Sequence, residues 1–226
     1  VVVVGSSNTD LVVKTGRFPK PGETLVGGDF FLFQGGKGAN QAVAASRMGA
    51  QVSFISKVGK DLFGKQTQES LEKEGISTRL VLEDAEKASG IALITVNEHG
   101  ENTIVVAPGA NASLSPYDIQ AALPSIPSHD FILCQLEIPI ETIIFLANYA
   151  QAEMKNLILN PAPAPLNGFA NAALPTAACK KSFFTPDSPL IVFARPVAKS
   201  APIPIACANF PTTGILLAAE IPAFIL

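Results

Sequence analysis

The sequence predicts an α/β fold, in which helices cover a parallel β-sheet and a small antiparallel sheet stands apart as a lid. Two observations predict the main sheet. Short apolar runs of strand length alternate with segments of helix length, and polar residues follow several of the apolar runs. Alternation of this kind is typical of parallel sheets, because parallel strands need long crossover connections. A third observation, a group of β-rich segments without helices between them, predicts the lid.

The elements of the main body follow one another in a regular order. Short apolar runs predict strands at residues 1–4, 52–57, 80–82, 131–135 and 156–160. Helical spacing predicts helices at residues 41–48, 64–74 and 141–152, and the pair Ser115-Pro116 predicts the start of another. Pro116 supports that start because the first helical turn makes no internal use of its N–H groups. In such folds, ligands bind beyond the carboxyl ends of the strands.

The lid is expected from residues 11–33 and 90–107. Both segments are rich in strand-forming side chains and contain no helical pattern. Within the second segment, Glu98-His99-Gly100-Glu101 predicts a hairpin turn, with glycine at the position that needs an unusual backbone dihedral. A lid of this kind excludes water from a site beneath it.

The composition excludes several classes of protein. The chain has 226 residues, which allows one large domain or two small ones. Its hydrophobic content of 48% and mean hydropathy of +0.34 are high, but its apolar runs are far shorter than the roughly 20 residues of a membrane-spanning helix. We therefore expect no membrane span, and the first residues show no secretory signal. The net charge of −3 argues against a nucleic-acid partner.

The cysteines and histidines show no chemical pattern. Cys134, Cys179 and Cys207 are widely spaced, and they form neither a disulfide framework nor a metal-binding motif. This spacing favours a reducing, cytoplasmic location and predicts no metal site. His99 and His129 are isolated, and we expect them to be surface residues rather than ligands or bases.

The chain changes character near residue 160. There are 29 charged residues in the first 159 positions and only 6 in the last 67, whereas the prolines number 7 and 11 in the same two parts. Residues 161–165 and 201–205 place prolines where a helix or sheet interior needs N–H donors. No helix is predicted between residues 164 and 210, so the last third does not continue the α/β pattern.

The most informative motif is Gly35-Gly36-Lys37-Gly38-Ala39-Asn40, which runs into the helix predicted at residues 41–48. Glycine has no Cβ, so we expect the backbone to come close to a ligand here. The helix start should also leave N–H groups free to face that ligand. The motif is not a phosphate-binding P-loop, because Lys37 is followed by glycine instead of serine or threonine and the glycine spacing differs.

Polar residues follow the predicted strands of the main sheet. Asn8 and Asp10 follow the first strand, Glu137 follows residues 131–135, and Asn160 ends the last strand. Together with Asn40, these residues predict a pocket for a polyol, since sugar hydroxyls need acceptors and donors.

Each of these residues also has a simpler interpretation. Asn8 or Asp10 taken singly is more often a turn-capping residue. Glu137 could be a solvated loop carboxylate before Pro139, and Lys37 could be a surface cation, although its place between glycines makes that the weaker interpretation.

Six motifs together resemble the ribokinases of the PfkB family of sugar and nucleoside kinases. They occur in order over residues 1–165: Asn8-Thr9-Asp10, residues 18–24, residues 35–42, Gly109-Ala110-Asn111, Gln135-Leu136-Glu137 and residues 160–164. The resemblance implies a ribokinase-like three-layer fold whose β lid also pairs two subunits into a homodimer. It implies transfer of the γ-phosphoryl group of ATP to the 5-hydroxyl of D-ribose, with Mg²⁺ required and K⁺ activating.

The resemblance also implies which residues bind the sugar. Asp10 and Asn40 would grip its hydroxyls. The full set of implied ribose contacts is Asn8, Asp10, Gly36, Lys37, Gly38, Asn40 and Glu137.

The last third departs from the family pattern. The family motif Asp-Thr-x-Gly-Ala-Gly-Asp ends in the catalytic base, but its nearest counterpart, residues 211–217, has Leu216 and Leu217 at the anion-hole and base positions. Residues 185–190 resemble a family Thr-Pro-Asn-x-x-Glu segment, with Asp187 as a candidate nucleotide-binding residue and Leu190 in place of the glutamate. No catalytic residue is therefore identified, and the loss of a general base typically costs about 10²–10⁴ in rate.

Three hypotheses follow. The chain is a ribokinase whose last third is incomplete or altered, and is therefore impaired; or it is a catalytically inactive ribose-binding protein; or it is a PfkB kinase for another sugar or nucleoside. In each case residues 1–165 form the sugar-binding portion, and the Pro/Ala-rich residues 166–226 stand where the nucleotide-binding portion is expected.

Overall fold

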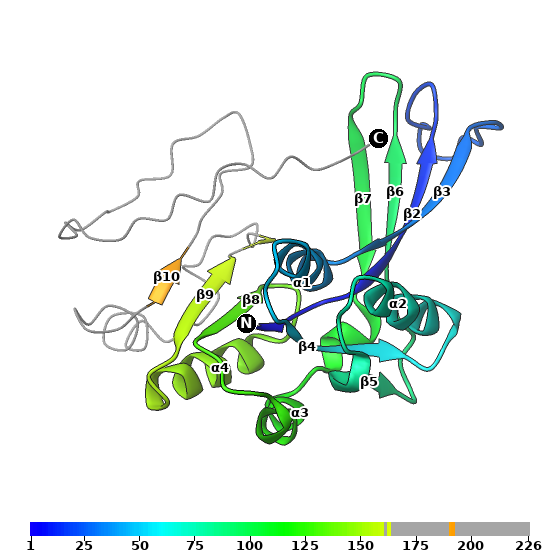
Figure 1. Ribbon diagram of the computed structural model, residues 1–226. Helices are drawn as coiled ribbons and strands as arrows, with labels where there is room; N and C mark the ends of the chain where they lie inside the picture. The colour runs from blue at the N-terminus through cyan, green and yellow to red at the C-terminus, as the bar shows by residue number, and fades with distance from the viewer. Residues whose placement is uncertain (161, 164–189, 193–226) are drawn as a thin grey trace, which may run out of the picture. The chain divides into compact units, whose positions relative to one another are not determined.

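The computed structural model describes residues 1–160, 162–163 and 190–192 (Figure 1). Its contacts divide the chain into two units, Val1–Arg195 and Pro196–Leu226, and the description below concerns the first. Asp187, Leu216, Leu217, Cys179 and Cys207 lie outside the described residues, as does most of the segment in which no helix was predicted.

The main sheet has six parallel strands in the order β10-β9-β8-β1-β4-β5. The strands are β1 (Val2–Val4), β4 (Ser53–Gly59), β5 (Val81–Asp84), β8 (Phe131–Gln135), β9 (Asn156–Asn160) and β10 (Leu190–Val192). All but β10 were predicted. The helices that connect the strands allow them to run in one direction, so the alternation along the chain becomes a parallel sheet.

Helices cover both faces of this sheet (Figure 1). They are α1 (Lys37–Arg47), α2 (Leu62–Lys73), α3 (Pro116–Ala122) and α4 (Ile140–Ala152), with short 3₁₀ helices η1 (Thr78–Leu80), η2 (Gly109–Ser113) and η3 (Leu123–Ser125). The helix predicted at Ser115-Pro116 is confirmed: Ser115 and Asp118 form a reciprocal capping box, and Pro116 is the first helical residue.

The alternation of side chains along β1 explains the three layers. Val2 and Val4 belong to a core with Ile119 of α3 and Leu146 of α4. Val3, between them, points to the other face and belongs to a second core, whose members from the covering helices include Ala39, Ala42 and Leu71. Successive strand residues face opposite sides, so three consecutive valines serve two cores.

The second sheet is the predicted lid, with strand order β3-β2-β6-β7. Its strands are β2 (Asn8–Lys14), β3 (Asp29–Gly35), β6 (Gly90–Val96) and β7 (Asn102–Ala107). The outer pairs, β2·β3 and β6·β7, are antiparallel as predicted, but the central pair β2·β6 is parallel. Both central strands enter the lid from the main body, at Asn8 and Gly90, and therefore run the same way.

Two local predictions need correction. Asn8 and Asp10 were expected just past the carboxyl end of the first strand, with a turn-capping role as the simpler interpretation. They lie within a further strand, β2, so neither is a turn-capping residue. Helix α1 was expected from residue 41 but begins at Lys37, with Gly36 as its N-cap. The predicted hairpin between β6 and β7 is confirmed: Asn97 N donates to Glu101 O at 3.0 Å, and Gly100 has a φ of 76°.

One carboxylate ties the lid to the main body. Asp61, the N-cap of α2, accepts hydrogen bonds from Gly64 N at 2.8 Å, Ser89 N at 2.8 Å and Ser89 Oγ at 2.7 Å. Ser89 immediately precedes β6. Burial alone would raise the pKa of Asp61, but these hydrogen bonds outweigh it and lower the pKa. The start of β6 is therefore anchored to the N-terminus of α2.

No helix within the described ranges is long and apolar enough to cross a membrane. Cys134 is fully buried in β8, and burial raises the pKa of its thiol to about 12. A thiol with this pKa stays protonated and unreactive. His129, expected at the surface, is buried instead, and its ring stacks on Tyr149.

Candidate functional site

The candidate site lies where the carboxyl ends of β1 and β8 meet the start of α1. β1 ends at Val4 and continues through Gly5, Ser6 and Ser7, and β8 ends at Gln135, two residues before Glu137. This is the edge of the sheet at which ligands bind in folds of this kind.

Glu137 is the centre of this arrangement. Its carboxylate accepts hydrogen bonds from Ser6 Oγ at 2.6 Å, from Lys37 Nζ at 2.8 Å and from Lys37 N at 3.0 Å. Its side chain is 13% exposed, so it is not the solvated loop carboxylate of the simpler interpretation. Burial alone would raise the pKa of Glu137, but the bonds from Lys37 and Ser6 together lower it. Glu137 is therefore ionised near neutral pH, and Lys37 is its ion-pair partner rather than a solitary surface cation.

The first N–H groups of α1 already have protein partners. Lys37 N donates to Glu137, Gly38 N donates to Ser6 Oγ at 3.4 Å, and Ala39 N donates to Ser6 O at 2.9 Å. The expectation that these groups face a ligand is therefore wrong. The partial positive charge of the helix start instead stabilises the Glu137 carboxylate.

The glycines of the motif make room for the chain itself. Gly36 has a φ of 90°, and a Cβ there would lie 2.7 Å from Ser7 Cα. A Cβ at Gly38 would lie 2.6 Å from the carbonyl carbon of Gly5. Real Cβ contacts are longer than either distance, so the absence of side chains lets α1 pack directly on the segment that follows β1. The close approach predicted for a ligand is thus made by the backbone of residues 5–8.

Asp10 offers acceptor capacity that the protein does not use. No described residue donates a hydrogen bond to its half-buried carboxylate. Burial, and then repulsion from Glu137, raise the pKa of Asp10 to about 6, although the charge of Lys37 acts in the opposite direction. Gly35 leaves space beside it, since a Cβ at Gly35 would lie 2.3 Å from Asp10 Oδ2.

Asn8 lies two residues before Asp10 in β2, so both side chains are on the same face of the strand. It is 5% exposed, and its Oδ1 accepts a hydrogen bond from Asn111 Nδ2 at 2.8 Å. Asn111, in η2, is 1% exposed and also bonds the backbone of Ser7. Asn8 is therefore a buried amide that Asn111 holds in place.

Asn40 makes no side-chain hydrogen bond to the other predicted site residues that the structure describes. It is exposed on the first turn of α1, and its backbone N–H donates to Gly36 O at 2.9 Å. None of the described residues hydrogen-bonds to its side-chain amide. Asn160, the last residue of β9, pairs in register with Gln135 at the carboxyl edge of the sheet.

Sequence reasoning missed two residues of the site. Ser6 hydrogen-bonds to both Glu137 and Gly38 at the start of α1. Asn111 hydrogen-bonds to the backbone of Ser7, the residue before β2. Ser6 directly follows the first strand, which is a usable signal for a site residue. Asn111 belongs to a motif that resembles the family pattern, but no local pattern indicates that it contacts residues more than one hundred positions away.

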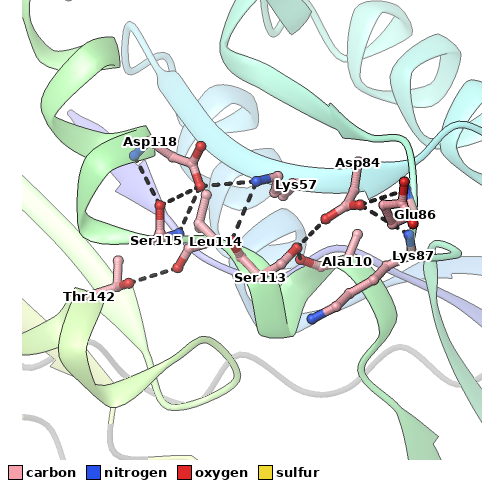
Figure 2. Close-up of polar contacts among 10 residues, drawn as sticks. All are labelled: Lys57, Asp84, Glu86, Lys87, Ala110, Ser113, Leu114, Ser115, Asp118 and Thr142. Carbon is pink, nitrogen blue, oxygen red and sulfur yellow. Dashed lines mark hydrogen bonds and ion pairs between the residues drawn. The ribbon is translucent and has the colours of Figure 1, made fainter.

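A second polar cluster holds η2 in place (Figure 2). Ser113 Oγ donates to Asp84 Oδ2, and Lys57 Nζ donates to Ser113 O at 3.4 Å and to Asp118 Oδ2 at 3.1 Å. Thr142 Oγ1 of α4 donates to Leu114 O at 2.7 Å. These contacts join β4, β5, α3 and α4 to the segment that carries Asn111.

Asp10 offers acceptor oxygens beside the Lys37–Glu137 pair, and hydroxyl groups are the kind of donor that such oxygens accept from. In the part of the chain that the structure describes, no group of three or more His, Cys, Asp or Glu side chains could hold a metal ion. A separate pocket of about 230 Å³ lies at the amino ends of the strands, lined by residues that include Ser53, Arg79 and His129. It is at the opposite edge from the candidate site.

Comparisons with known proteins agree with this architecture. The profile of the pfkB family carbohydrate kinases matches residues 1–180. The ribokinase of Haemophilus influenzae is 42% identical over 166 residues, covering 74% of this chain and 54% of that protein. The deoxyribokinase of Salmonella typhi is 38% identical over 187 residues, covering 83% and 60%. The solved structure of Arabidopsis thaliana ribokinase complexed with ribose and ATP is 30% identical, with a TM-score of 0.63, covering 71% and 53%.

The fold and the comparisons define an α/β protein of the carbohydrate-kinase class, with a three-layer body and a β lid. The chain belongs to the pfkB family of carbohydrate kinases. The predicted resemblance and fold class are therefore confirmed. The chain spans 54% and 60% of the two curated relatives named above.

Proposed function

We propose that this chain is a ribokinase-like sugar kinase, and that the reaction is transfer of the γ-phosphoryl group of ATP to the 5-hydroxyl of D-ribose. The observation that carries the proposal is the unused acceptor capacity of Asp10 beside the Lys37–Glu137 ion pair, at the carboxyl edge of a pfkB-family sheet. The curated ribokinase at 42% identity supports ribose as the sugar.

Each proposed contact residue has a distinct contribution. Asp10 accepts hydrogen bonds from sugar hydroxyls, Asn8 and Asn40 supply amide groups, and Lys37 supplies charge beside Glu137. Gly36 and Gly38 act through the backbone, because their missing side chains let α1 lie against residues 5–8. The proposed set of ribose contacts is the one that the family resemblance implies: Asn8, Asp10, Gly36, Lys37, Gly38, Asn40 and Glu137.

ATP, Mg²⁺ and K⁺ complete the proposed reaction. When bound, they supply the phosphoryl group and the charge that stabilises its transfer. The nucleotide-binding candidate Asp187 lies outside the described residues, and the described acidic side chains form no metal-binding group. We propose that residues 1–165 form the sugar-binding portion, that residues 166–226 replace the nucleotide-binding portion, and that turnover by this chain is impaired.

The lid supports a proposed homodimer. Leu32, Leu11, Leu93 and Val105 stand side by side across the four lid strands, on the face opposite Asp10. Leu93 is 51% and Val105 67% exposed. A row of exposed apolar side chains on a sheet is a typical protein interface, and a second copy of the same lid is the proposed partner. We also propose a cytoplasmic location, which the spacing of the cysteines favours.

A ribose-binding protein without catalysis is the second candidate. It is favoured because the sugar-side contacts of Ser6, Lys37 and Glu137 are present. In contrast, Leu216 and Leu217 stand at the anion-hole and base positions of the family motif. A kinase for another sugar is the third candidate, because the deoxyribokinase of Salmonella typhi is 38% identical to this chain.

Calorimetry and a coupled ADP-release assay separate these functions. D-Ribose, 2-deoxy-D-ribose, D-fructose and adenosine are titrated into the protein, and ATP is titrated separately. The proposal expects ribose to bind most tightly, Asp10→Ala to abolish that binding, and Asp29→Ala, at an exposed lid carboxylate, to leave it unchanged. Ribose binding without ADP release supports the binding protein. Absence of ribose binding by the intact chain contradicts both.

A further inference from the structure

The side-chain amide of Asn111 hydrogen-bonds to Ser7 and Asn8, where the chain passes from the main body into the lid strand β2. Its Oδ1 accepts from Ser7 N at 2.9 Å, and its Nδ2 donates to Ser7 O at 3.0 Å and to Asn8 Oδ1 at 2.8 Å. The side chain is 1% exposed, so water does not replace these partners. Asn111 thus bonds Ser7 much as a neighbouring strand would.

The partners of Asn111 determine which way its amide faces. A backbone N–H can only donate and a backbone carbonyl can only accept, so Ser7 requires oxygen on one side of the Asn111 amide and nitrogen on the other. The nitrogen then faces Asn8 as a donor, and the Asn8 atom opposite it must be the acceptor oxygen Oδ1. The orientation of Asn8 therefore follows from two backbone groups.

We propose that Asn111 is a positioning residue that makes Asn8 a hydrogen-bond donor toward the sugar; this rests on the proposed function. Asn8 Oδ1 is already used by Asn111, and no described residue accepts a hydrogen bond from Asn8 Nδ2. Asp10, on the same face of β2, can only accept when ionised. The pair therefore presents one donor and one acceptor, which matches a sugar hydroxyl that accepts at Asn8 and another that donates at Asp10.

The surroundings keep this arrangement rigid. A Cβ at Gly90 would lie 2.2 Å from Asn111 Nδ2 and 2.3 Å from Asn8 Oδ1, so only glycine leaves room for the two amides to meet. η2 is fixed by the cluster in which Ser113 bonds Asp84 and Lys57 (Figure 2). Neither amide can turn without breaking contacts to other elements.

A double-mutant cycle tests the proposal. Asn111→Asp keeps the acceptor for Ser7 N–H but removes the donor, so Asn8 must turn its nitrogen toward position 111 and present oxygen to the sugar. We expect the affinity for D-ribose to fall roughly 10-fold to 100-fold, the range for one mispaired buried group. In an Asn8→Ala background, Asn111→Asp should cause no further loss. An equal loss in both backgrounds, or no loss in either, overturns the proposal.

Two further measurements cover variants that fail to fold and a protein that does not bind ribose. Asn8→Asp keeps the bond from Asn111 and places an acceptor toward the sugar, so it should weaken ribose binding as strongly as Asn111→Asp does. In the unmodified chain, NMR should show slow hydrogen exchange at the side-chain amide of Asn111 and faster exchange at that of Asn8. The reverse order overturns the proposed orientation whether or not ribose binds, whereas absence of ribose binding alone counts against the proposed function.

Discussion

Lys37 and Glu137, which are 100 positions apart in the chain, form an ion pair of 2.8 Å between Nζ and Oε1. The backbone N–H of the same lysine donates to the other oxygen of Glu137 at 3.0 Å. One residue thus holds both oxygens of the carboxylate, which fixes the start of α1 against the end of β8. This pairing explains why Glu137 remains ionised although its side chain is largely buried.

Replacement of Glu137 tests the importance of this pairing. Glu137→Gln keeps the size of the side chain but removes the charge and one acceptor, so the free energy of unfolding should fall by about 1–3 kcal/mol. Chemical denaturation measures the change. Glu69→Gln is the control, because the Lys65–Glu69 pair is exposed and 3.9 Å long, and its loss should cost almost nothing. Equal effects of the two replacements would falsify the structural role assigned to Glu137.

Asp10 should make ribose binding depend on pH. Its pKa in the folded protein is about 6, so the carboxylate gains a proton as the pH falls through 6 and loses acceptor capacity. We expect ribose affinity, measured by calorimetry, to be constant above pH 7 and to fall below pH 6. Asp10→Asn should bind weakly at every pH, whereas Asp29→Asn should keep the dependence of the unmodified chain.

The same group should affect stability in the opposite direction. The folded pKa of Asp10 lies above its ordinary value of 3.8, so between about pH 4 and pH 6 the folded state binds the proton more tightly than the unfolded state. Its contribution to stability therefore rises as the pH falls through 6 and is complete near pH 4. Thermal unfolding of the unmodified chain and of Asp10→Asn, compared over this pH range, measures the contribution of Asp10 to stability. An identical pH profile for both proteins contradicts the shifted pKa.

Gly38 should not tolerate a side chain, although it lies in a helix. Alanine is ordinarily more favourable than glycine in a helix, by about 1 kcal/mol. At this position, however, the new Cβ would meet the Gly5 carbonyl carbon at 2.6 Å, so Gly38→Ala should destabilise the fold by about 1–3 kcal/mol. Gly16→Ala is the matched control, because a Cβ there meets nothing within 4 Å. Stabilisation by Gly38→Ala would show that α1 does not pack on Gly5 as described.

Asp61 should control local opening at the start of the lid. Asp61→Asn keeps an N-cap side chain for α2, but it can no longer accept from Ser89 N–H and from Gly64 N–H at the same time. Hydrogen exchange should become faster in residues 89–92 and stay unchanged in β1 and β8. Glu83→Gln, at an exposed position of β5, should leave all these segments protected. Uniform acceleration across the protein would indicate a global loss of stability instead of a lid anchor.

The proposed dimer is tested at the lid face opposite Asp10. Leu93→Lys places a charge within the exposed apolar row, so the protein should shift from dimer to monomer in light scattering after size exclusion. Leu62→Lys, at an exposed position of α2, is the control and should leave the mass unchanged. A monomer in the unmodified chain rules out the dimer, and a dimer that survives Leu93→Lys places the interface elsewhere.

Much of the fold could be predicted because the relevant signals are local. Valines at positions 2–4 predict a strand buried on both faces, and Ser115-Pro116 predicts a helix start. The pairing of strands is not a local property, however. β2 and β6 run parallel because both leave the main body at the same edge, and neither segment carries that information in its own residues.

The candidate site, like the fold, has features that local sequence predicts and features that depend on contacts between distant residues. By itself, the sequence determined the family motifs, the glycine-rich start of α1 and the residue types available to a sugar. Only the tertiary structure decided their roles, because these roles depend on contacts between residues far apart in the chain. Glu137 takes the helix N–H that was expected to face a ligand, and Asn111 sets the orientation of Asn8. A hydrogen-bonding group is available to a ligand only when the folded chain leaves it without a partner, and that is decided by packing.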